Sequence, residues 1–275
     1  MDFLGCRIRH EFWPSCLRTG IPQKDYPPFD EEYFEWIDVL ESVVQARDTY
    51  TMIELGAGFG RWMVRAGVAM RQSANLPCHY VGVEAEPLHF NWIPMHFRDN
   101  GIDPGGQRFL RAAVSDRSGY AHFYVGTPSI PDNTAAEWYG QQLINSHEVP
   151  AKTDEDEYLG LPVITHQSGF KSVRVRTVSL SEVLYNVSKV DLLDMDIQGQ
   201  ELKVISAAIA DVTAKVKRIH IGTHSAQVEL GLRQLLAGSD WQCLADYPCS
   251  STNPTPWGPI AFQDGVQSWV NARLK

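Results

Sequence analysis

The chain has 275 residues, enough for one large domain, and its 44% hydrophobic and 21% charged residues are typical of a soluble globular protein. Its formal net charge of −9 argues against non-specific binding to nucleic acid or to an anionic membrane. The sequence shows no secretory peptide and no apolar run as long as a membrane span, and its five cysteines lack paired spacing. We therefore expect a cytoplasmic protein with reduced thiols that binds neither nucleic acid nor a membrane.

Short apolar runs alternate with helical patterns along most of the chain. After a turn-rich stretch at 22–30, a helix is predicted over 31–46, with apolar residues at helical spacing: Phe34, Ile37, Leu40, Val43 and Val44. The further predicted strands are 50–55, 78–85, 108–115, 190–197 and 216–223, and the further helices are 61–72, 87–100 (ended by Gly101) and 200–212. This alternation indicates an α/β fold with a mostly parallel sheet and helices on both faces.

Several segments depart from the alternation. Residues 116–125 are interpreted as a hairpin, and strand 173–178 is followed by a capping box at 179–182. Segments 241–247 and 265–272 have no helix between them, which indicates an antiparallel pair at one sheet edge. The long irregular stretch 126–172 is typical of a lid or binding segment. We expect a single domain over 1–275, with 1–50 as its helical N-terminal segment and 126–172 as an insertion or lid.

The stretch IELGAGFG, residues 53–60, runs from a strand into a glycine-rich turn, which is a pattern that binds nucleotides. A dinucleotide fingerprint would place its third glycine where this chain has Arg61. Glu54 would repel a pyrophosphate, but it would suit the ammonium and sulfonium groups of S-adenosylmethionine. Glu84 ends the next strand, where an acid can accept hydrogen bonds from both ribose hydroxyls. The pattern favours S-adenosylmethionine; the alternative is a glycine turn beside two surface acids.

Further motifs resemble the FkbM family of class I S-adenosylmethionine methyltransferases. They are EAEP (84–87) followed by Asn100-Gly101, RAAVSDRSG (111–119) and VSLSEVLYNVSKVDLLDMDIQGQE (178–201). The resemblance covers 51–208 without the insertion. It implies a Rossmann-like, seven-stranded, mostly parallel sheet with an antiparallel C-terminal strand, and methyl transfer, most often to a hydroxyl of a sugar or natural product. Asp194 and Gln198 stand where the family usually has lysine and glutamate, so no family role transfers to them.

Ligands of open parallel sheets bind beyond the carboxyl ends of the strands. The candidate cofactor-binding residues at those ends are Glu54, Gly56, Ala57, Gly58, Glu84, Ala85 and Asp196. The resemblance implies that Ala113 and Val114 flank the adenine. It also implies that Asp196 holds either the methionine ammonium or the acceptor hydroxyl.

Methyl transfer to an alcohol needs alignment, exclusion of water and an acceptor for the hydroxyl proton. His224 and Asp196 are the rival candidates for this catalytic base, although His224 serves equally well as a structural hydrogen-bonding residue. His220, inside the same strand, is interpreted as a packed core residue. The candidate substrate residues are Trp138, Tyr139, Gln142 and Gln198, and Gln141 belongs to the same candidate ligand wall; the alternative for the aromatic residues is a cluster that pins the loop to the domain.

A divalent metal is disfavoured, because Asp194 and Asp196 are expected to face opposite ways and no acid follows the fifth strand within 222–227. We expect a small-molecule acceptor and consider a homodimer. The favoured function is O-methylation of a small polar, sugar-like or polyketide natural product. The alternatives are N-methylation of a small-molecule amine, a non-catalytic S-adenosylmethionine-binding protein, and a nicotinamide oxidoreductase, which Glu54 and Arg61 argue against.

Overall fold

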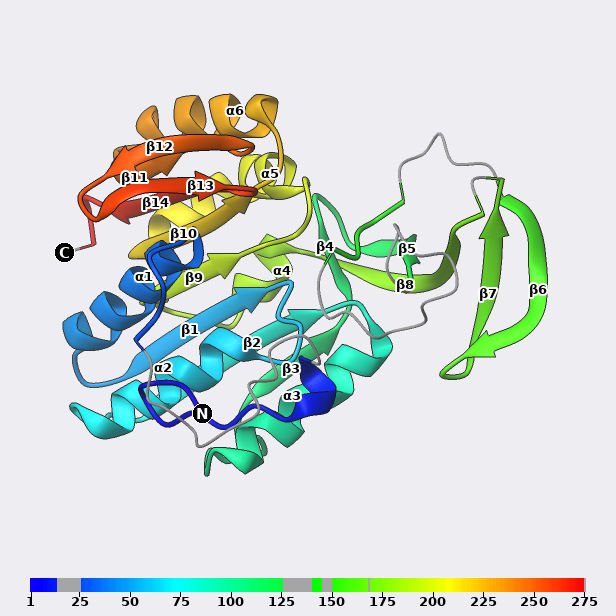
Figure 1. Ribbon diagram of the computed structural model, residues 1–275, viewed down its shortest axis with the longest axis horizontal. Coiled ribbons are helices and arrows are strands. Elements are labelled where there is room, and N and C mark those ends of the chain that lie inside the picture. Colours follow the sequence, from blue (N-terminus) through cyan, green and yellow to red (C-terminus); the bar gives the residue numbers. More distant parts are fainter. Residues whose placement is uncertain (14–25, 126–139, 145–149, 168, 275) are drawn as a thin grey trace.

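The computed structural model describes residues 1–13, 26–125, 140–144, 150–167 and 169–274. Its main sheet has seven strands: β1 (Tyr50–Leu55), β2 (Cys78–Glu84), β3 (Arg108–Arg111), β9 (Leu192–Met195), β10 (Arg218–Thr223), β11 (Trp241–Tyr247) and β14 (Gly265–Asn271). Their order is β11-β14-β10-β9-β1-β2-β3 (Figure 1). All neighbouring pairs are parallel except those that β14 makes with β10 and β11. The predicted fold class, with its antiparallel C-terminal strand, is confirmed.

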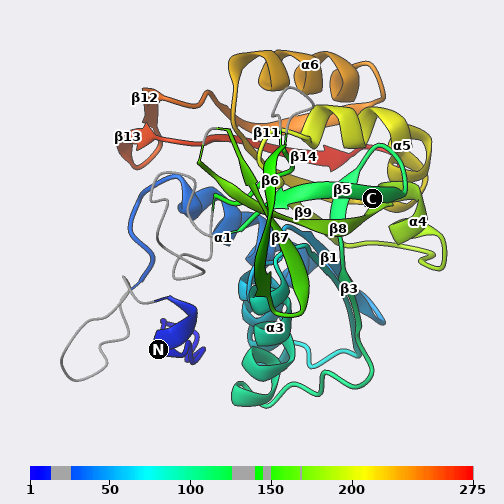
Figure 2. The ribbon, with the colours of Figure 1, turned by 90° about the vertical axis from the view of Figure 1, so that its right-hand side faces the viewer.

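Helices cover both faces of this sheet, and each face has its own core. One face carries α1 (Glu32–Gln45), α2 (Arg61–Gln72) and α3 (Pro87–Asp99); the other carries α4 (Leu180–Leu184), α5 (Glu201–Lys215) and α6 (Ala226–Ala237) (Figures 1 and 2). A short 3-10 helix, η1 (His10–Phe12), lies near the N-terminus. Because side chains alternate along a strand, Tyr50 and Met52 of β1 pack towards α1 and α2, whereas Ile53 and Leu55 pack towards α5.

Helix α1 is confirmed, but its buried face differs from the predicted stripe. Val44 is 70% exposed, whereas Val39 is fully buried and the polar Asp38 and Ser42 are buried beside it. Asp38 accepts a hydrogen bond from Arg218 on β10, so a buried ion pair holds part of this interface. The apolar spacing could not reveal that a polar face turns inward.

The predicted strand 108–115 is divided between two sheets. Its first half is β3, and its second half, β4 (Ala113–Ser115), pairs in parallel with β8 (Lys171–Ser179). The following β5 (Gly119–Tyr124) pairs antiparallel with β8. The predicted hairpin over 116–125 is therefore wrong, because β4 and β5 pair with β8 and not with each other.

The described part of the 126–172 insertion consists largely of strands. β6 (Pro150–Tyr158) and β7 (Leu161–His166) form a hairpin that continues the small sheet through β8 and projects from the main body (Figures 1 and 2). This small sheet has its own core, built from Ala85, Ala113, Phe123, Val163, Val173 and Val175. Trp138 and Tyr139 lie outside the described residues.

Two local predictions are confirmed and a third is incomplete. The Ser179 side chain accepts a hydrogen bond from the Glu182 amide, 3.2 Å away, and so caps α4. Gly101 ends α3 with a φ of 71°. β11 and β14 pair as predicted, but a hairpin of β12 (Ser251–Thr255) and β13 (Gly258–Phe262) separates them along the chain. Among the described residues, no helix has both the length and the apolar character needed to span a bilayer.

Candidate active site

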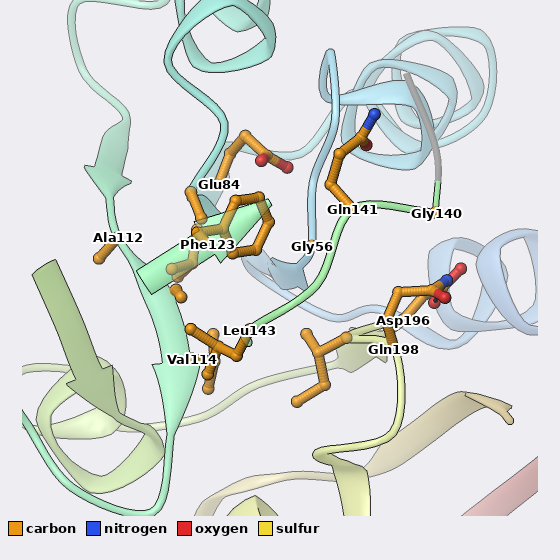
Figure 3. Close-up of a pocket in the computed structure, with 14 residues that line it drawn as sticks. Gly56, Glu84, Ala112, Val114, Phe123, Gly140, Gln141, Leu143, Asp196 and Gln198 are labelled. Carbon is orange, nitrogen blue, oxygen red and sulfur yellow. Dashed lines mark hydrogen bonds between the residues drawn. The ribbon is translucent and has the colours of Figure 1, made fainter. Parts of the chain in front are cut away.

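A first pocket lies at the carboxyl ends of the central strands and encloses about 590 Å³ of empty space, part of it open to solvent (Figure 3). Among the predicted cofactor residues, six line it: Gly56, Glu84, Ala85, Ala113, Val114 and Asp196. Its other lining residues are Val83, Ala112, Phe123, Gly140, Gln141, Leu143, Ile197 and Gln198. The predicted strand-end residues thus meet at one pocket that has apolar walls and a few polar groups.

Gly56 forms part of the floor where two loops approach each other. Its φ is +79°, and a Cβ atom there would lie 1.9 Å from the carbonyl oxygen of Asp196. The amides of Gly56 and Ala57 both donate to the carbonyl oxygen of Val83, at 3.0 Å. Only glycine fits this position, and the bare backbone opens the pocket to a ligand.

Glu84 joins the end of β2 to the glycine turn. One carboxylate oxygen accepts from the amide of Gly58 at 2.7 Å, and the other accepts from the amide of Glu86 at 2.7 Å. Burial raises the pKa of Glu84 to about 8. A carboxylate has acceptor capacity beyond these two bonds, so Glu84 can also receive hydroxyl donors from the pocket.

Glu54 does not line this first pocket. Its two oxygens accept from the amides of Trp62 and Met63, at 3.2 and 3.0 Å, in the first turn of α2. Burial raises the pKa of Glu54 to about 7. A helix N-terminus after such a turn is where dinucleotide cofactors place their pyrophosphate. Here Glu54 occupies those amides, which argues against a diphosphate at this position.

A second pocket, with about 660 Å³ of empty space, shares Gly56 and Asp196 with the first. Its acidic lining residues are Glu31, Glu32, Glu35, Glu54, Asp194, Asp196 and Asp264, and Ala57, Arg61 and His220 line it too. The expectation that Asp194 and Asp196 face opposite ways is wrong, because residues two apart in an extended segment share a face. Asp264 supplies an acid near the end of β10 that the segment 222–227 lacks.

His224 lies between two carboxylates. Its Nδ1 is 3.1 Å from Glu201, and its Nε2 is 3.2 Å from Asp196. Burial alone would lower the pKa of His224, but the interactions with Asp196 and Glu201 outweigh it and raise the pKa to about 11. At neutral pH this imidazole is therefore protonated and has no lone pair with which to accept a proton.

Asp196 stands at the boundary of the two pockets. Its side chain is 51% exposed, and Gln198 donates a hydrogen bond to it at 3.1 Å. Burial would raise the pKa of Asp196, but the interaction with His224 outweighs it and lowers the pKa. Asp196 is thus an ionised, accessible carboxylate, and Gln198 beside it also lines the first pocket, as Figure 3 shows.

Several lining residues lack a signal in the sequence. Phe123 lies on β5, and Gly140 and Leu143 come from the described segment 140–144 of the insertion, which crosses the pocket in Figure 3 and also carries Gln141, a predicted ligand residue. The predicted Gln142 does not line the pocket, and its carbonyl oxygen accepts from the Tyr124 amide at 3.1 Å. These contacts depend on the pairing of β5 with β8. The sequence signal that could have identified Phe123 is the alternation of inward-facing and outward-facing residues along β5.

The family model and the curated relative that match this chain are both described as methyltransferases. The family model described as "Methyltransferase FkbM domain" matches residues 54–236. A Jannaschia sp. (strain CCS1) protein named "Putative methyltransferase" is 28% identical over 269 residues, which are 96% of this chain and 89% of that protein.

Two solved structures match this chain at low similarity. The methyltransferase FkbM of Methylobacillus flagellatus KT has 11% identity and a TM-score of 0.47, over 82% of this chain and 45% of that one. The precorrin-6y C5,15-methyltransferase of Geobacter metallireducens GS-15 has 9% identity and a TM-score of 0.44, over 85% of each chain. The assignment rests on the family model, which spans more than half of the sequence: the chain belongs to the FkbM methyltransferase family.

Proposed function

We propose that this chain is an S-adenosylmethionine-dependent O-methyltransferase that acts on a hydroxyl of a small polar, sugar-like or polyketide natural product. The observation that carries the proposal is the carboxylate of Glu84 in the first pocket, at the end of β2 and beside the glycine turn. Two ribose hydroxyls would donate to it. Ala113, Val114 and Phe123 provide apolar walls suited to a flat adenine ring.

The position of Asp196 between the pockets supports a separate role for each: the first would bind the cofactor and the second would bind the acceptor. With the nucleoside in the first pocket, the sulfonium methyl group would lie at the shared boundary and the acceptor would approach through the second pocket. The acceptor oxygen attacks the methyl carbon as the carbon–sulfur bond breaks, and the hydroxyl proton passes to Asp196. His224, already protonated, holds Asp196 in place and takes no proton itself.

Substitution of Glu84 tests the cofactor assignment. We expect Glu84→Gln to weaken S-adenosylhomocysteine binding by roughly 10- to 100-fold in calorimetry, because an NH2 donor replaces one of the two acceptor oxygens and leaves buried donors unpaired, at a cost of about 1–3 kcal/mol. Glu11→Gln is the control, because Glu11 is exposed and lines neither pocket. Unchanged affinity in a folded Glu84→Gln protein, or tighter binding of NAD than of S-adenosylhomocysteine by the wild type, would refute the assignment.

The acceptor is identified by incubating the protein with S-adenosylmethionine and fractions of hydroxylated metabolites and following the mass gain of one methyl group. The hydroxyl assignment is supported when the new methyl group is bonded to oxygen in NMR spectra. Tight cofactor binding without turnover on any fraction would instead favour a non-catalytic binding protein.

N-methylation of a small amine is the second candidate, and the acidity of the second pocket favours it. Seven carboxylates and one guanidinium line that pocket, so it would attract a cationic amine. The bound ammonium would first lose its proton, and acids of this pocket other than Asp196 could take it before the neutral amine attacks, so Asp196→Asn should then reduce turnover far less than for an alcohol. The same variant therefore separates the two acceptor classes.

A further inference from the structure

Three side chains outside the proposed methyl-transfer chemistry come together between α1 and the main sheet. Glu35 lies on α1, Asp194 on β9 and His220 on β10, and one metal-ligating atom of each lies within 4.8 Å of the others. The register of β9 and β10 places Asp194 directly beside His220. Asp194 is 3% exposed and His220 4% exposed, yet all three residues line the second pocket.

Asp194 differs from the acids around it in what it binds. Glu32 accepts from Arg61, Glu54 accepts from two amides of α2, and Glu31 accepts from two backbone amides before β14. By contrast, the buried Oδ1 of Asp194 accepts from no N–H or hydroxyl group in the part of the chain that the structure describes; the Asp194 side chain lies against the Glu35 carboxyl group, which can donate only if it carries a proton. A buried acceptor without a donor is costly, so this oxygen needs a cationic or donor ligand.

His220 is held in a manner suited to a metal ligand. Its Nδ1 lies 2.8 Å from Asp38, and because a carboxylate can only accept, Nδ1 carries the hydrogen. Asp38 is itself fixed by Arg218, at 2.6 Å, and by the hydroxyl of Ser268. Burial opposes a charged imidazole, but Asp38 and Glu35 raise the pKa of His220, so a metal ion at Nε2 would replace a proton on that nitrogen. This carboxylate–histidine arrangement orients the imidazole and increases its basicity at metal sites.

We propose that Glu35, Asp194 and His220 form a binding site for one divalent transition-metal ion of the Zn²⁺ or Mn²⁺ class. Two carboxylates and one neutral imidazole are a donor set that such ions accept, and they would offset the cation's charge. Arg61 lines the same pocket, but Glu32 already binds its guanidinium. If the proposed function holds, the ion would lie on the acceptor side and could lower the pKa of a bound hydroxyl.

Titration of the chelator-treated full-length protein with zinc chloride, and separately with manganese chloride, tests this site. We expect calorimetry to show one ion bound per chain by at least one of the two metals. Asp194→Asn and His220→Gln should each weaken that binding at least 100-fold. The matched control is Asp264→Asn, which changes an acid of the same pocket outside the three ligands and should leave the affinity within about threefold.

S-adenosylhomocysteine affinity, measured on the same samples without metal, tests the cofactor assignment separately and shows whether each variant is folded. If Asp194→Asn or His220→Gln unfolds, Glu35→Gln is measured instead, because Glu35 is less buried than the other two ligands. We expect it to cause the same loss of metal affinity. The proposal is overturned if the wild type binds neither metal. It is also overturned if the ligand variants bind as the wild type does, or if Asp264→Asn weakens binding as much as they do.

Discussion

His224 gains its chemical character from side chains that are remote in the sequence. Interactions with Asp196 and Glu201 raise its pKa to about 11 although burial opposes this. A histidine with an ordinary pKa near 6.5 would change charge around neutrality. At this pKa the imidazole keeps its proton over the physiological range, and we propose that it positions Asp196.

We expect His224→Gln to lower kcat by up to about 100-fold, through misplacement of Asp196, with little change in S-adenosylhomocysteine affinity. Since the raised pKa keeps His224 charged from pH 6 to 9, the wild-type profile of kcat/KM should show no ionisation of His224 near pH 6.5. Rates measured between pH 5.5 and 9.5 check both points. If the wild-type kcat/KM rose with pH around 6.5 and this rise were absent from His224→Gln, His224 would be identified as the base.

At the scale of elements, the turn after β1 and the segment after β9 are in backbone contact at Gly56. The amide of Asp196 donates to the carbonyl oxygen of Leu55 at 3.0 Å, and a Cβ atom at position 56 would overlap the Asp196 carbonyl. The two segments that line both pockets are therefore fixed relative to each other. Glycine at position 56 therefore allows both the close contact of these two segments and the access of a ligand.

Gly56→Ala should destabilise the protein by about 3 kcal/mol or more, because a positive φ and a backbone overlap each cost on the order of 1–3 kcal/mol. It should also weaken S-adenosylhomocysteine binding, since the Asp196 segment must move. Urea denaturation and calorimetry measure the two effects. Gly106→Ala is the control, because a Cβ atom there has no neighbour within 4 Å, and it should remain within about 0.5 kcal/mol of wild type.

At the scale of the whole molecule, α3 buries two histidines, His89 and His96, against the main sheet. Burial lowers the pKa of His96 to about 4 and that of His89 to about 3. Both pKa values lie below the unfolded value near 6.5, so the unfolded chain takes up protons first as the pH falls. Their contribution to stability is present above pH 6.5 and is lost as the pH falls towards 4.

His96→Gln should therefore reduce the loss of unfolding free energy between pH 7.5 and pH 5 by about 2 kcal/mol. Urea denaturation at the two pH values, for wild type and variant, gives this difference. The matched control is His79→Gln, a change at an exposed histidine, which should leave the pH dependence as it is in the wild type. Equal pH dependence in wild type and His96→Gln would show that His96 is not the residue responsible.

The strand–helix order, the glycine turn and the acids at the strand ends were predictable because each has a local pattern. β1 and α2 occupy the predicted residues 50–55 and 61–72, and Glu84 ends β2 inside the first pocket. The division of 108–115 between two sheets was not predictable, because it depends on pairing with β8, about 60 residues further along the chain.

The sequence by itself determined the fold class, the family and the strand ends at which a ligand pocket forms, since periodicity and motif spacing are properties of neighbouring residues. Only the tertiary structure decided which acids have donors and which histidine is charged. It placed Glu54 against the amides of the first turn of α2, Asp194 against Glu35, and His224 between two carboxylates. Desolvation and charge pairing depend on distances between residues far apart in the chain, and the fold alone sets those distances.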